Sequence, residues 1–395
     1  MKKIYLTGYY GQNNLGDDYL FYSIVNQLSN LAEEVELNIE VGKENFETKL
    51  YTDIVENYEN IKFKVTYVGG IKGKWNKLLS IVKANYWIVG GGGLFTSEDA
   101  TRMRHFNSYL QAAHLSATKT CLYGIDIDSL KEKNYITEWK KVLSKVDFIE
   151  TRNKECADRL RFLFGNGSKI KNGVDITHAF FTEEEEKADD KKEFLSEHNL
   201  LDNYVIWAIA MPWNRIELEN PEIRTRYEKL CGQFCSILEG FSMFQHVFLP
   251  FYEDSDIYMV HSLVDESSVN YKIIDYNIPL GEKRLLFKYA KQAVVMRFHG
   301  IQFALFHCTP FMAVSYSPKA TNILNELGLQ DLYVEFGIRK NSCFMKVFDI
   351  DDTDFEKLKS NLMSHMYDVK VKEASERLKE CAALNKELLL DWLKS

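Results

Sequence analysis

The sequence predicts an α/β protein with two Rossmann-like lobes facing across a cleft and a long C-terminal helical segment. Short β-rich runs alternate with amphipathic runs in both halves of the chain, which is the pattern of parallel sheets covered by helices. Between the halves, the stretch TEEEEKADDKKEFLSEHN is almost wholly charged or polar, as expected of a solvated linker or a linker helix. The length of 395 residues also suits two domains better than one hydrophobic core.

The first lobe is expected to span residues 1–181. Its β-rich runs predict strands over 3–10, 35–41, 63–70, 86–93, 119–126 and 147–152. Its amphipathic runs predict helices over 17–32, 101–116, 132–145 and 153–164. Because strands and helices alternate, the sheet should be mostly parallel.

The second lobe is expected to span residues 203–350, after a linker over 182–202. It begins with the strand-like run YVIWAIAMPW and ends with a strand, helix, strand, helix unit over 292–329. Further elements are expected as helices over 221–240 and 254–266 and strands over 246–251 and 269–275. Residues 351–395 show sustained helical periodicity and are expected to pack back across the lobes. In such folds ligands bind at the carboxyl ends of the strands.

Composition excludes several classes of protein. A formal charge of −8 argues against nucleic-acid binding, which requires a basic surface. The seven cysteines are scattered without a CxxC pair, so neither a disulfide framework nor a metal site is predicted. Cys231 and Cys235 would share a helix face, where core packing explains them better than metal binding. The N-terminal run MKKIYLTGYYGQNN has no signal-peptide core, which predicts a cytoplasmic protein.

The segment AVVMRFHGIQFALF holds the strongest candidate site. A run of buried-strand character leads into Arg297 and His299, after which helical spacing begins. Strand alternation would place both side chains on the same side of the sheet. The N–H groups and dipole of a helix start favour anions, and Arg adds a planar fork for carboxylate or phosphate, while His can exchange a proton near neutral pH. A structural Arg followed by a capping His would fit this spacing equally well.

The next strand, PFMAVSY, leads through Ser317 and Pro318 into a second helix. Ser is a common N-cap and Pro favours the first helical position, so Tyr316 and Lys319 should lie beside the same cleft. Lys319 could hold a second anionic oxygen. A solvent-exposed lysine in a first helical turn is an equally good explanation.

The opening segment TGYYGQNNLGDDYLF forms a strand-to-helix turn whose glycines would permit close backbone approach to a ligand. It is not a dinucleotide fingerprint, and a tight turn capped by Asn14 or Asp17 explains it nearly as well. Asp17 or Asp18 could accept a proton from a sugar hydroxyl.

Four consecutive glycines, which include Gly91, Gly92 and Gly93, follow the apolar run YWIV. They suit a backbone nest or a wall along which a substrate lies. A tight connection is the alternative interpretation.

The segment KGKWNKLLSIVK combines basic residues with apolar residues at helical spacing. Such a helix could rest on an anionic membrane surface, which would place the protein at the inner face of the membrane. An ordinary amphipathic helix that packs on the sheet is the simpler interpretation.

In content and order, these segments resemble the polysaccharide pyruvyltransferase family. The resemblance runs from GYYGQNNLGDD through GGGL, ETRN and VDITHAFF, and it is strongest at MRFHGIQFALFHCTPFMAVSYSPK. It implies a GT-B-like fold, phosphoenolpyruvate as the donor substrate, and no further cofactor. The implied product is a pyruvate ketal on a sugar of a surface polysaccharide or its precursor, so the acceptor would be a sugar, an oligosaccharide or a lipid-linked saccharide.

The resemblance also implies roles for individual residues. Arg297 would bind the anionic groups of the donor, His299 would perform acid–base chemistry, and Lys319 would be a weaker clamp. Asn14 and Asp17 would position the acceptor on the first lobe, which leaves the donor to the second.

One residue departs from the family pattern. The family has an Arg before Pro-Trp at the end of the first strand of the second lobe, where this chain has Met211. Arg215 or Arg152 could replace the missing cation. Without a replacement, the loss of charge-assisted hydrogen bonds would weaken donor binding by roughly 1.5 to 3 kcal/mol each.

Two other functions are compatible with this architecture, because a fold does not fix chemistry. The chain could be a glycosyltransferase that uses a nucleotide sugar, in which case it would bind a uridine or cytidine nucleotide. It could also be a non-catalytic sugar-binding member of a polysaccharide assembly complex, which would bind acceptor without consuming donor. The residue pattern defines neither the acceptor sugar nor the oligomeric state.

Overall fold

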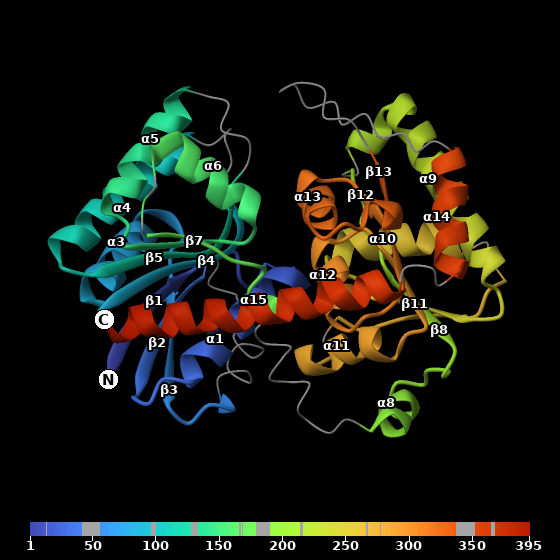
Figure 1. The fold of residues 1–395 in the computed structure, drawn as a ribbon, viewed down its shortest axis with the longest axis horizontal. Helices are drawn as coiled ribbons and strands as arrows, with labels where there is room; N and C mark the ends of the chain where they lie inside the picture. The colour runs from blue at the N-terminus through green and yellow to red at the C-terminus, as the bar shows by residue number, and fades with distance from the viewer. Residues whose placement is uncertain are drawn as a thin grey trace. The chain divides into compact units, whose positions relative to one another are not determined.

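The computed structural model describes residues 1–12, 14–41, 56–95, 100–127, 133–165, 167, 169–178, 190–213, 216–265, 268–276, 278–336, 352–364 and 368–395. The chain forms two compact units (Figure 1). The N-terminal unit contains Met1–Glu183 and Lys379–Ser395, and the C-terminal unit contains Glu184–Leu378. Each is an α/β lobe, so the predicted fold class of two Rossmann-like lobes is confirmed.

The N-terminal unit is built on a parallel seven-stranded sheet with the order β3-β2-β1-β4-β5-β6-β7. The strands are β1 (Lys2–Thr7), β2 (Val35–Val41), β3 (Ile61–Tyr67), β4 (Tyr86–Phe95), β5 (Lys119–Ile127), β6 (Phe148–Thr151) and β7 (Ile170–Asn172). The helices are α1 (Leu15–Ser29), α3 (Gly70–Lys83), α4 (Ala100–Leu115), α5 (Lys133–Lys145) and α6 (Lys154–Phe164). In Figure 1, α4, α5 and α6 lie on one side of this sheet and α1 on the other.

The C-terminal unit is built on a parallel six-stranded sheet with the order β10-β9-β8-β11-β12-β13. The strands are β8 (Tyr204–Ala208), β9 (Gln245–Phe248), β10 (Tyr271–Ile273), β11 (Gln292–Val295), β12 (Phe311–Ser315) and β13 (Tyr333–Glu335). The helices are α8 (Lys191–Glu197), α9 (Pro221–Gly240), α10 (Glu253–Val264), α11 (Leu280–Tyr289), α12 (Phe298–Phe306), α13 (Pro318–Glu326) and α14 (Asp352–Ser364), with 3-10 turns at Glu217–Glu219 and Gln330–Leu332.

Burial explains why these runs form parallel strands. Strands β8, β9, β11 and β12 are buried along their whole length, because helices cover both faces of the sheet. At their centre Trp207 lies 5.5 Å from Phe248 between ring centroids, and its indole N–H donates to Nδ1 of His246 at 3.0 Å. Burial lowers the pKa of His246 to about 4, so this core histidine is neutral.

The N-terminal core contains a buried acid. Glu150 on β6 is fully buried, and its two carboxylate oxygens have no hydrogen-bond partner among the described residues. Burial raises the pKa of Glu150 well above its ordinary value, which favours the protonated form of this side chain.

Both sheets have a topological switch point. In the N-terminal unit the chain runs outward from β1 through β2 to β3 and then returns to β4 on the other side of β1. In the C-terminal unit β8 and β11 have the same relation. Crevices at such points, outside the carboxyl ends of the strands, are the usual ligand sites of open α/β sheets.

The C-terminal segment differs in detail from the single expected helix. It consists of α14 and α15 (Asp368–Lys394), and the division between the two units falls within α15. Near its start, the Ser375 hydroxyl donates to the Phe306 carbonyl within the C-terminal unit. Near its end, the Leu393 carbonyl accepts from the Tyr86 hydroxyl at 2.7 Å, and Trp392 lies 5.2 Å from the Tyr86 ring. The last residues of the chain therefore complete the N-terminal unit.

The expected linker is only partly exposed. Residues 179–189 lie outside the described part, but α8 follows and packs on the C-terminal unit. Phe194 is buried, with its ring 5.6 Å from that of Tyr289. The short elements β7, β13 and α11 lacked a sequence prediction, because short runs show little periodicity. Helix α8 lies in the stretch for which a linker helix was the alternative to a solvated linker.

Candidate active site

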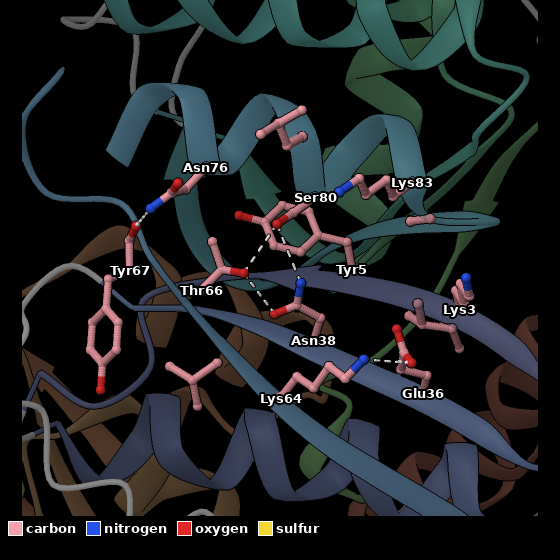
Figure 2. Close-up of a pocket in the computed structure, with 14 residues that line it drawn as sticks. Lys3, Tyr5, Glu36, Asn38, Lys64, Thr66, Tyr67, Asn76, Ser80 and Lys83 are labelled. Carbon is pink, nitrogen blue, oxygen red and sulfur yellow. Dashed lines mark hydrogen bonds and ion pairs between the residues drawn. The ribbon is translucent and has the colours of Figure 1, made fainter. Parts of the chain in front are cut away.

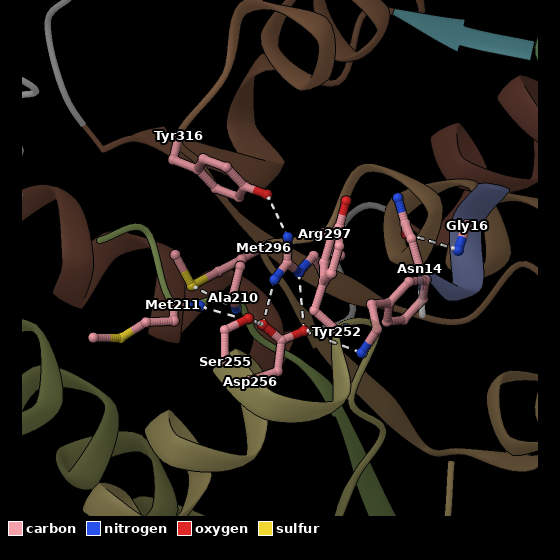
Figure 3. Close-up of polar contacts among 11 residues, drawn as sticks. Asn14, Gly16, Ala210, Met211, Tyr252, Ser255, Asp256, Met296, Arg297 and Tyr316 are labelled. Atoms are coloured by element: carbon pink, nitrogen blue, oxygen red, sulfur yellow. Dashed lines mark hydrogen bonds and ion pairs between the residues drawn. The ribbon is translucent and has the colours of Figure 1, made fainter. Parts of the chain in front are cut away.

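The candidate site of the C-terminal unit lies where four adjacent strands end. The segments after β9, β8, β11 and β12 bring together Tyr252, Asp256, Met211, Arg297 and Tyr316 (Figure 3). This edge includes the β8/β11 switch point, the position at which open α/β sheets usually bind ligands.

Arg297 is the centre of this cluster. Its Nε donates to Oδ2 of Asp256 at 3.0 Å, its Nη2 donates to Oδ1 of the same carboxylate, and its Nη1 donates to the Tyr316 hydroxyl at 3.2 Å. The guanidinium carbon lies 4.6 Å from the centre of the Tyr252 ring, within cation–π range. An arginine has five N–H donors, so one N–H on each terminal nitrogen stays available to a ligand.

The protonation state of Arg297 follows from these contacts. Burial by itself would lower the pKa of Arg297, but the Tyr316 and Asp256 oxygens outweigh it and raise the pKa. The guanidinium is therefore a permanent, held cation whose charge is partly balanced by Asp256.

Asp256 is a site residue that sequence reasoning missed. Its side chain is buried and also accepts from the backbone N–H groups of Phe251 at 3.0 Å and Tyr252 at 2.9 Å. The backbone N–H of Met211 lies 3.5 Å from the same carboxylate. The acidic run EDSD, one residue after the predicted strand HVFLPF, gave a signal, because an acid in a first helical turn at a strand end can reach the neighbouring strand ends.

His299 lies two residues beyond Arg297, in a different setting from the one expected. Strand β11 ends at Val295, and Arg297 is the N-cap of α12, so His299 belongs to the first turn of a helix. The prediction that strand alternation aligns the two side chains is therefore wrong. Their shared position at a helix start is confirmed. His299 is half-buried, and its ring contacts Phe298 edge-on at 5.3 Å.

The close packing of α12 fixes this helix start. A Cβ atom at Gly300 would lie 2.9 Å from the Ala208 side chain, so the glycine lets α12 approach the end of β8. The Met296 N–H donates to the Ala208 carbonyl at 2.9 Å. These contacts hold Arg297 at the edge of the sheet.

The next helix start brings Tyr316 into the cluster. Ser317 is the N-cap of α13 with Pro318 at the first helical position, as predicted, although the serine side chain makes no capping hydrogen bond. Lys319 is half-buried in the first turn of α13. Its role as an anion clamp stays a prediction.

Met211 occupies the position of the expected family Arg. Its side chain is half-buried and packs against the hydrophobic core of the unit. Only its backbone N–H faces the Asp256 carboxylate. Arg215, one proposed replacement, lies outside the described residues.

Arg152, the other proposed replacement, belongs to the N-terminal unit. Its side chain is 3% exposed and lies 3.5 Å from Asp175 and 3.7 Å from Asp126. These two acids account for the buried charge, so a structural role explains Arg152 without a ligand.

Asn14 and Asp17 lie at the β1/β4 switch point of the N-terminal unit. Asn14 is the N-cap of α1, and its Oδ1 accepts from the Gly16 N–H at 3.1 Å. Its amide nitrogen donates to the Asp17 carboxylate. Asp18 is buried and accepts from the Gly11 N–H at 3.2 Å. Asn14 and Asp17 are partly accessible to solvent, so their side chains are not shielded from the predicted acceptor.

The four glycines lie within β4 rather than after a strand, and the register of β4 with β5 shifts between Gly92 and Phe95. A Cβ at Gly91 would lie 3.0 Å from Cβ of Leu20, and the Tyr10 hydroxyl donates to the Gly90 carbonyl at 2.8 Å. Packing against α1 and Tyr10 thus explains Gly90 and Gly91. Gly93 is exposed, so contact with a substrate stays a prediction for Gly92 and Gly93.

Comparison with solved structures identifies the class of fold. The UDP-GlcNAc 2-epimerase of Neisseria meningitidis, bound to UDP-GlcNAc, aligns at a TM-score of 0.63 with 10% identity, covering 100% of this chain and 99% of that chain. The UDP-GlcNAc 2-epimerase of Methanocaldococcus jannaschii aligns at 0.62 with 14% identity, covering 96% and 99%. Anabaena Alr3699/HepE in complex with UDP aligns at 0.58 with 9% identity, covering 100% of both chains. The architecture is thus of the GT-B type.

Comparison with sequence families gives the more specific result. The family model described as polysaccharide pyruvyl transferase matches residues 14–318. The chain therefore belongs to the polysaccharide pyruvyl transferase family, as the resemblance of its motifs predicted. Among curated proteins, none matches this chain.

Proposed function

We propose that this chain transfers the enolpyruvyl group of phosphoenolpyruvate to a sugar of a surface polysaccharide or its precursor and forms a pyruvate ketal. The main support for this proposal is the Arg297 guanidinium, which contacts Asp256, Tyr316 and Tyr252 and has two further N–H groups at the β8/β11 switch point. Such a fork suits a carboxylate or a phosphate.

The chemistry defines what the site must supply. A proton added to the methylene carbon of phosphoenolpyruvate produces a methyl group and an oxocarbenium-like centre at the neighbouring carbon. A sugar hydroxyl bonds to that centre and loses its proton. Phosphate then leaves with the electrons of its carbon–oxygen bond, and a second hydroxyl of the same sugar closes the ketal and loses its proton. The reaction needs a proton donor, a base and a cationic clamp.

The described residues offer candidates for each task. Arg297 would bind the donor carboxylate or phosphate, with Asp256 as a positioning residue that orients the fork. His299 would exchange protons with the reacting groups, since an imidazole can both donate and accept a proton. Tyr316 and Lys319 would border the donor, and Asn14 and Asp17 would position the sugar hydroxyls.

A binding experiment tests this assignment directly. Calorimetric titration of the purified protein with phosphoenolpyruvate should show binding that Arg297→Ala abolishes. His299→Ala should bind the donor with nearly wild-type affinity but release no phosphate in the presence of acceptor. Unchanged turnover in His299→Ala would contradict the acid–base role.

A second candidate function is transfer from a nucleotide sugar. Two observations favour it: Met211 stands where the family has a cation, and the structural neighbours include proteins bound to UDP-GlcNAc or UDP. The same titration with UDP-glucose distinguishes the two donors. Binding of UDP-glucose without binding of phosphoenolpyruvate would make glycosyl transfer the better hypothesis. Binding of a saccharide acceptor alone would instead indicate a non-catalytic partner.

A further inference from the structure

Helix α3 is amphipathic, but its apolar stripe faces solvent instead of the core of the protein. Its apolar side chains Ile71, Trp75 and Leu79 are spaced four residues apart and therefore form one stripe along the helix. They are 79%, 63% and 48% exposed. A helix that merely covers a sheet buries its apolar stripe against the core, so this outward stripe calls for another partner.

The opposite face of α3 faces the sheet and carries polar side chains as well as the buried Ile81. The Asn76 side chain donates to the Tyr67 carbonyl at 3.1 Å, and the Lys77 ammonium lies 2.8 Å from the Glu40 carboxylate. Ser80 joins a cluster in which its hydroxyl lies 3.0 Å from the Thr66 hydroxyl. These contacts would be lost if the helix rotated to bury its stripe, and each buried polar group would then lack a partner.

A polar hollow beside α3 is lined by side chains of this inner face and of the neighbouring strands (Figure 2). It has a volume of about 550 Å³ and lies between α3 and strands β1 to β3. Asn38 donates to Ser80 at 3.3 Å and accepts from Thr66 at 2.8 Å across its floor. The inner side of α3 is therefore already satisfied by its own unit.

Close packing fixes the start of the helix as well. A Cβ atom at Gly73 would lie 2.0 Å from the backbone carbonyl carbon of Val68, so only glycine permits this approach. Ile81 at the other end is fully buried. With both ends anchored, the stripe stays on the outer face.

The charge of α3 identifies the partner. The helix contains Lys72, Lys74, Lys77 and Lys83 and no acidic residue, although the whole chain has a formal charge of −8. Lys72, Lys74 and Lys83 are exposed. A second copy of the same face would bring like charges together, whereas an anionic surface with an apolar interior satisfies both the lysines and the stripe.

We propose that the outer face of α3 docks on a bilayer of anionic phospholipid, with Trp75 at the headgroup boundary. Among the described residues no helix is long and apolar enough to cross a membrane, so the contact is peripheral. This inference is independent of the proposed reaction, because binding to vesicles requires neither donor nor acceptor.

Sedimentation of the full chain with vesicles tests the proposal. Vesicles of phosphatidylglycerol and phosphatidylcholine in equal parts should bind the protein, and vesicles of phosphatidylcholine alone should bind it much less. Trp75→Ser should lower the partition coefficient by at least about tenfold, and Lys72→Gln and Lys74→Gln by roughly fivefold each. The matched control is Phe162→Ser, which removes an exposed aromatic side chain (89% exposed) from α6 of the same unit and should leave binding unchanged.

Tryptophan fluorescence supplies an independent readout. Trp87, Trp139, Trp207 and Trp213 are buried, and the half-buried Trp392 packs against Tyr86 and Phe148. A blue shift on vesicle addition would therefore come chiefly from Trp75. Trp75→Phe should retain binding and lose most of the shift. Equal binding by Trp75→Ser and wild type would overturn the proposal. So would a dimer that Trp75→Ser dissociates in solution without any vesicle binding, because the stripe would then be an interface between copies.

Discussion

The switch points of the two sheets have equivalent positions but opposite chemistry. Strands β1 and β4 of the N-terminal unit correspond to β8 and β11 of the C-terminal unit, with the same strand order around them. After β1 stand the N-cap Asn14 and the acidic Asp17, while the segment after β11 presents Arg297 and His299. One edge offers amide and carboxylate oxygens, and the other offers a cation and an imidazole.

Under the proposed reaction, this difference would assign the two substrates to different edges. Carboxylates and amides bind neutral hydroxyl groups well and repel anions, whereas a guanidinium fork attracts them. The comparison predicts an acceptor on the N-terminal edge and an anionic donor on the C-terminal edge.

The largest effect is expected from breaking the buried pair of the C-terminal edge. Arg297→Ala leaves the Asp256 carboxylate buried without its cation and should lower the free energy of unfolding by about 3 to 5 kcal/mol. The double variant Arg297→Ala with Asp256→Asn should cost less, because the remaining amide carries no charge. Chemical denaturation measures the free energies of unfolding of the two single variants and of the double variant. If the losses of the single variants add up to that of the double variant, the two side chains are not coupled.

The two cores should respond to pH in opposite directions. The folded pKa of His246, about 4, lies below the unfolded value of 6.5, so stability is present above pH 6.5 and is lost as pH falls toward 4, by about 3 kcal/mol. The folded pKa of Glu150 is raised, so its contribution is full below the unfolded value of 4.5 and is lost as pH rises through the folded pKa.

Hydrogen exchange followed by mass spectrometry can resolve the two units. As the pH falls from 6.5 to 4.5, the hydrogen-exchange rate, corrected for its intrinsic pH dependence, should increase in β8 and β9 and decrease in β5 and β6. His246→Gln should remove the first trend and Glu150→Gln the second. A parallel response of both units would contradict the assignment of these two groups.

Restoring the family cation at position 211 should strengthen donor binding at the C-terminal edge. Met211→Arg restores the family cation at the end of β8, and a side chain that turns from the core toward the donor would add one charge-assisted hydrogen bond, which corresponds to roughly ten- to hundredfold tighter donor binding. Met243→Arg is the matched control, since Met243 is 80% exposed in the same unit and precedes the amino end of β9, away from the carboxyl ends of the strands. Calorimetry with phosphoenolpyruvate should show a gain for Met211→Arg alone.

The smallest effect is expected at the acceptor edge. Asn14→Ala removes the N-cap of α1 and should cost about 1 kcal/mol of stability. Asn153→Ala removes the equivalent cap of α6 in the same unit, where Asn153 accepts from the Cys156 N–H at 2.8 Å. Both variants should lose similar stability, but Asn14→Ala alone should raise KM for the acceptor. An equal change in KM would assign Asn14 a capping role only.

The helices and strands were largely predictable from the sequence, because the burial of each element determines the pattern of apolar residues along it. The uninterrupted apolar runs at Val205–Ala208 and Ala293–Val295 predicted strands covered on both faces, and they are buried throughout. Helix α9 was expected over 221–240 and spans Pro221–Gly240. Family membership also followed from motifs that are local in the chain.

The tertiary structure alone decided which partners these motifs meet. Arg297 was identified from its local segment, but Asp256 lies 41 residues earlier and reaches it only because β9 and β11 flank β8 in the sheet. Gly91 needs to be glycine because α1 approaches β4 there, and α3 has its apolar face outward because polar groups of β2 and β3 hold its inner face. Periodicity records that a helix has an apolar stripe. Packing determines which way that stripe faces.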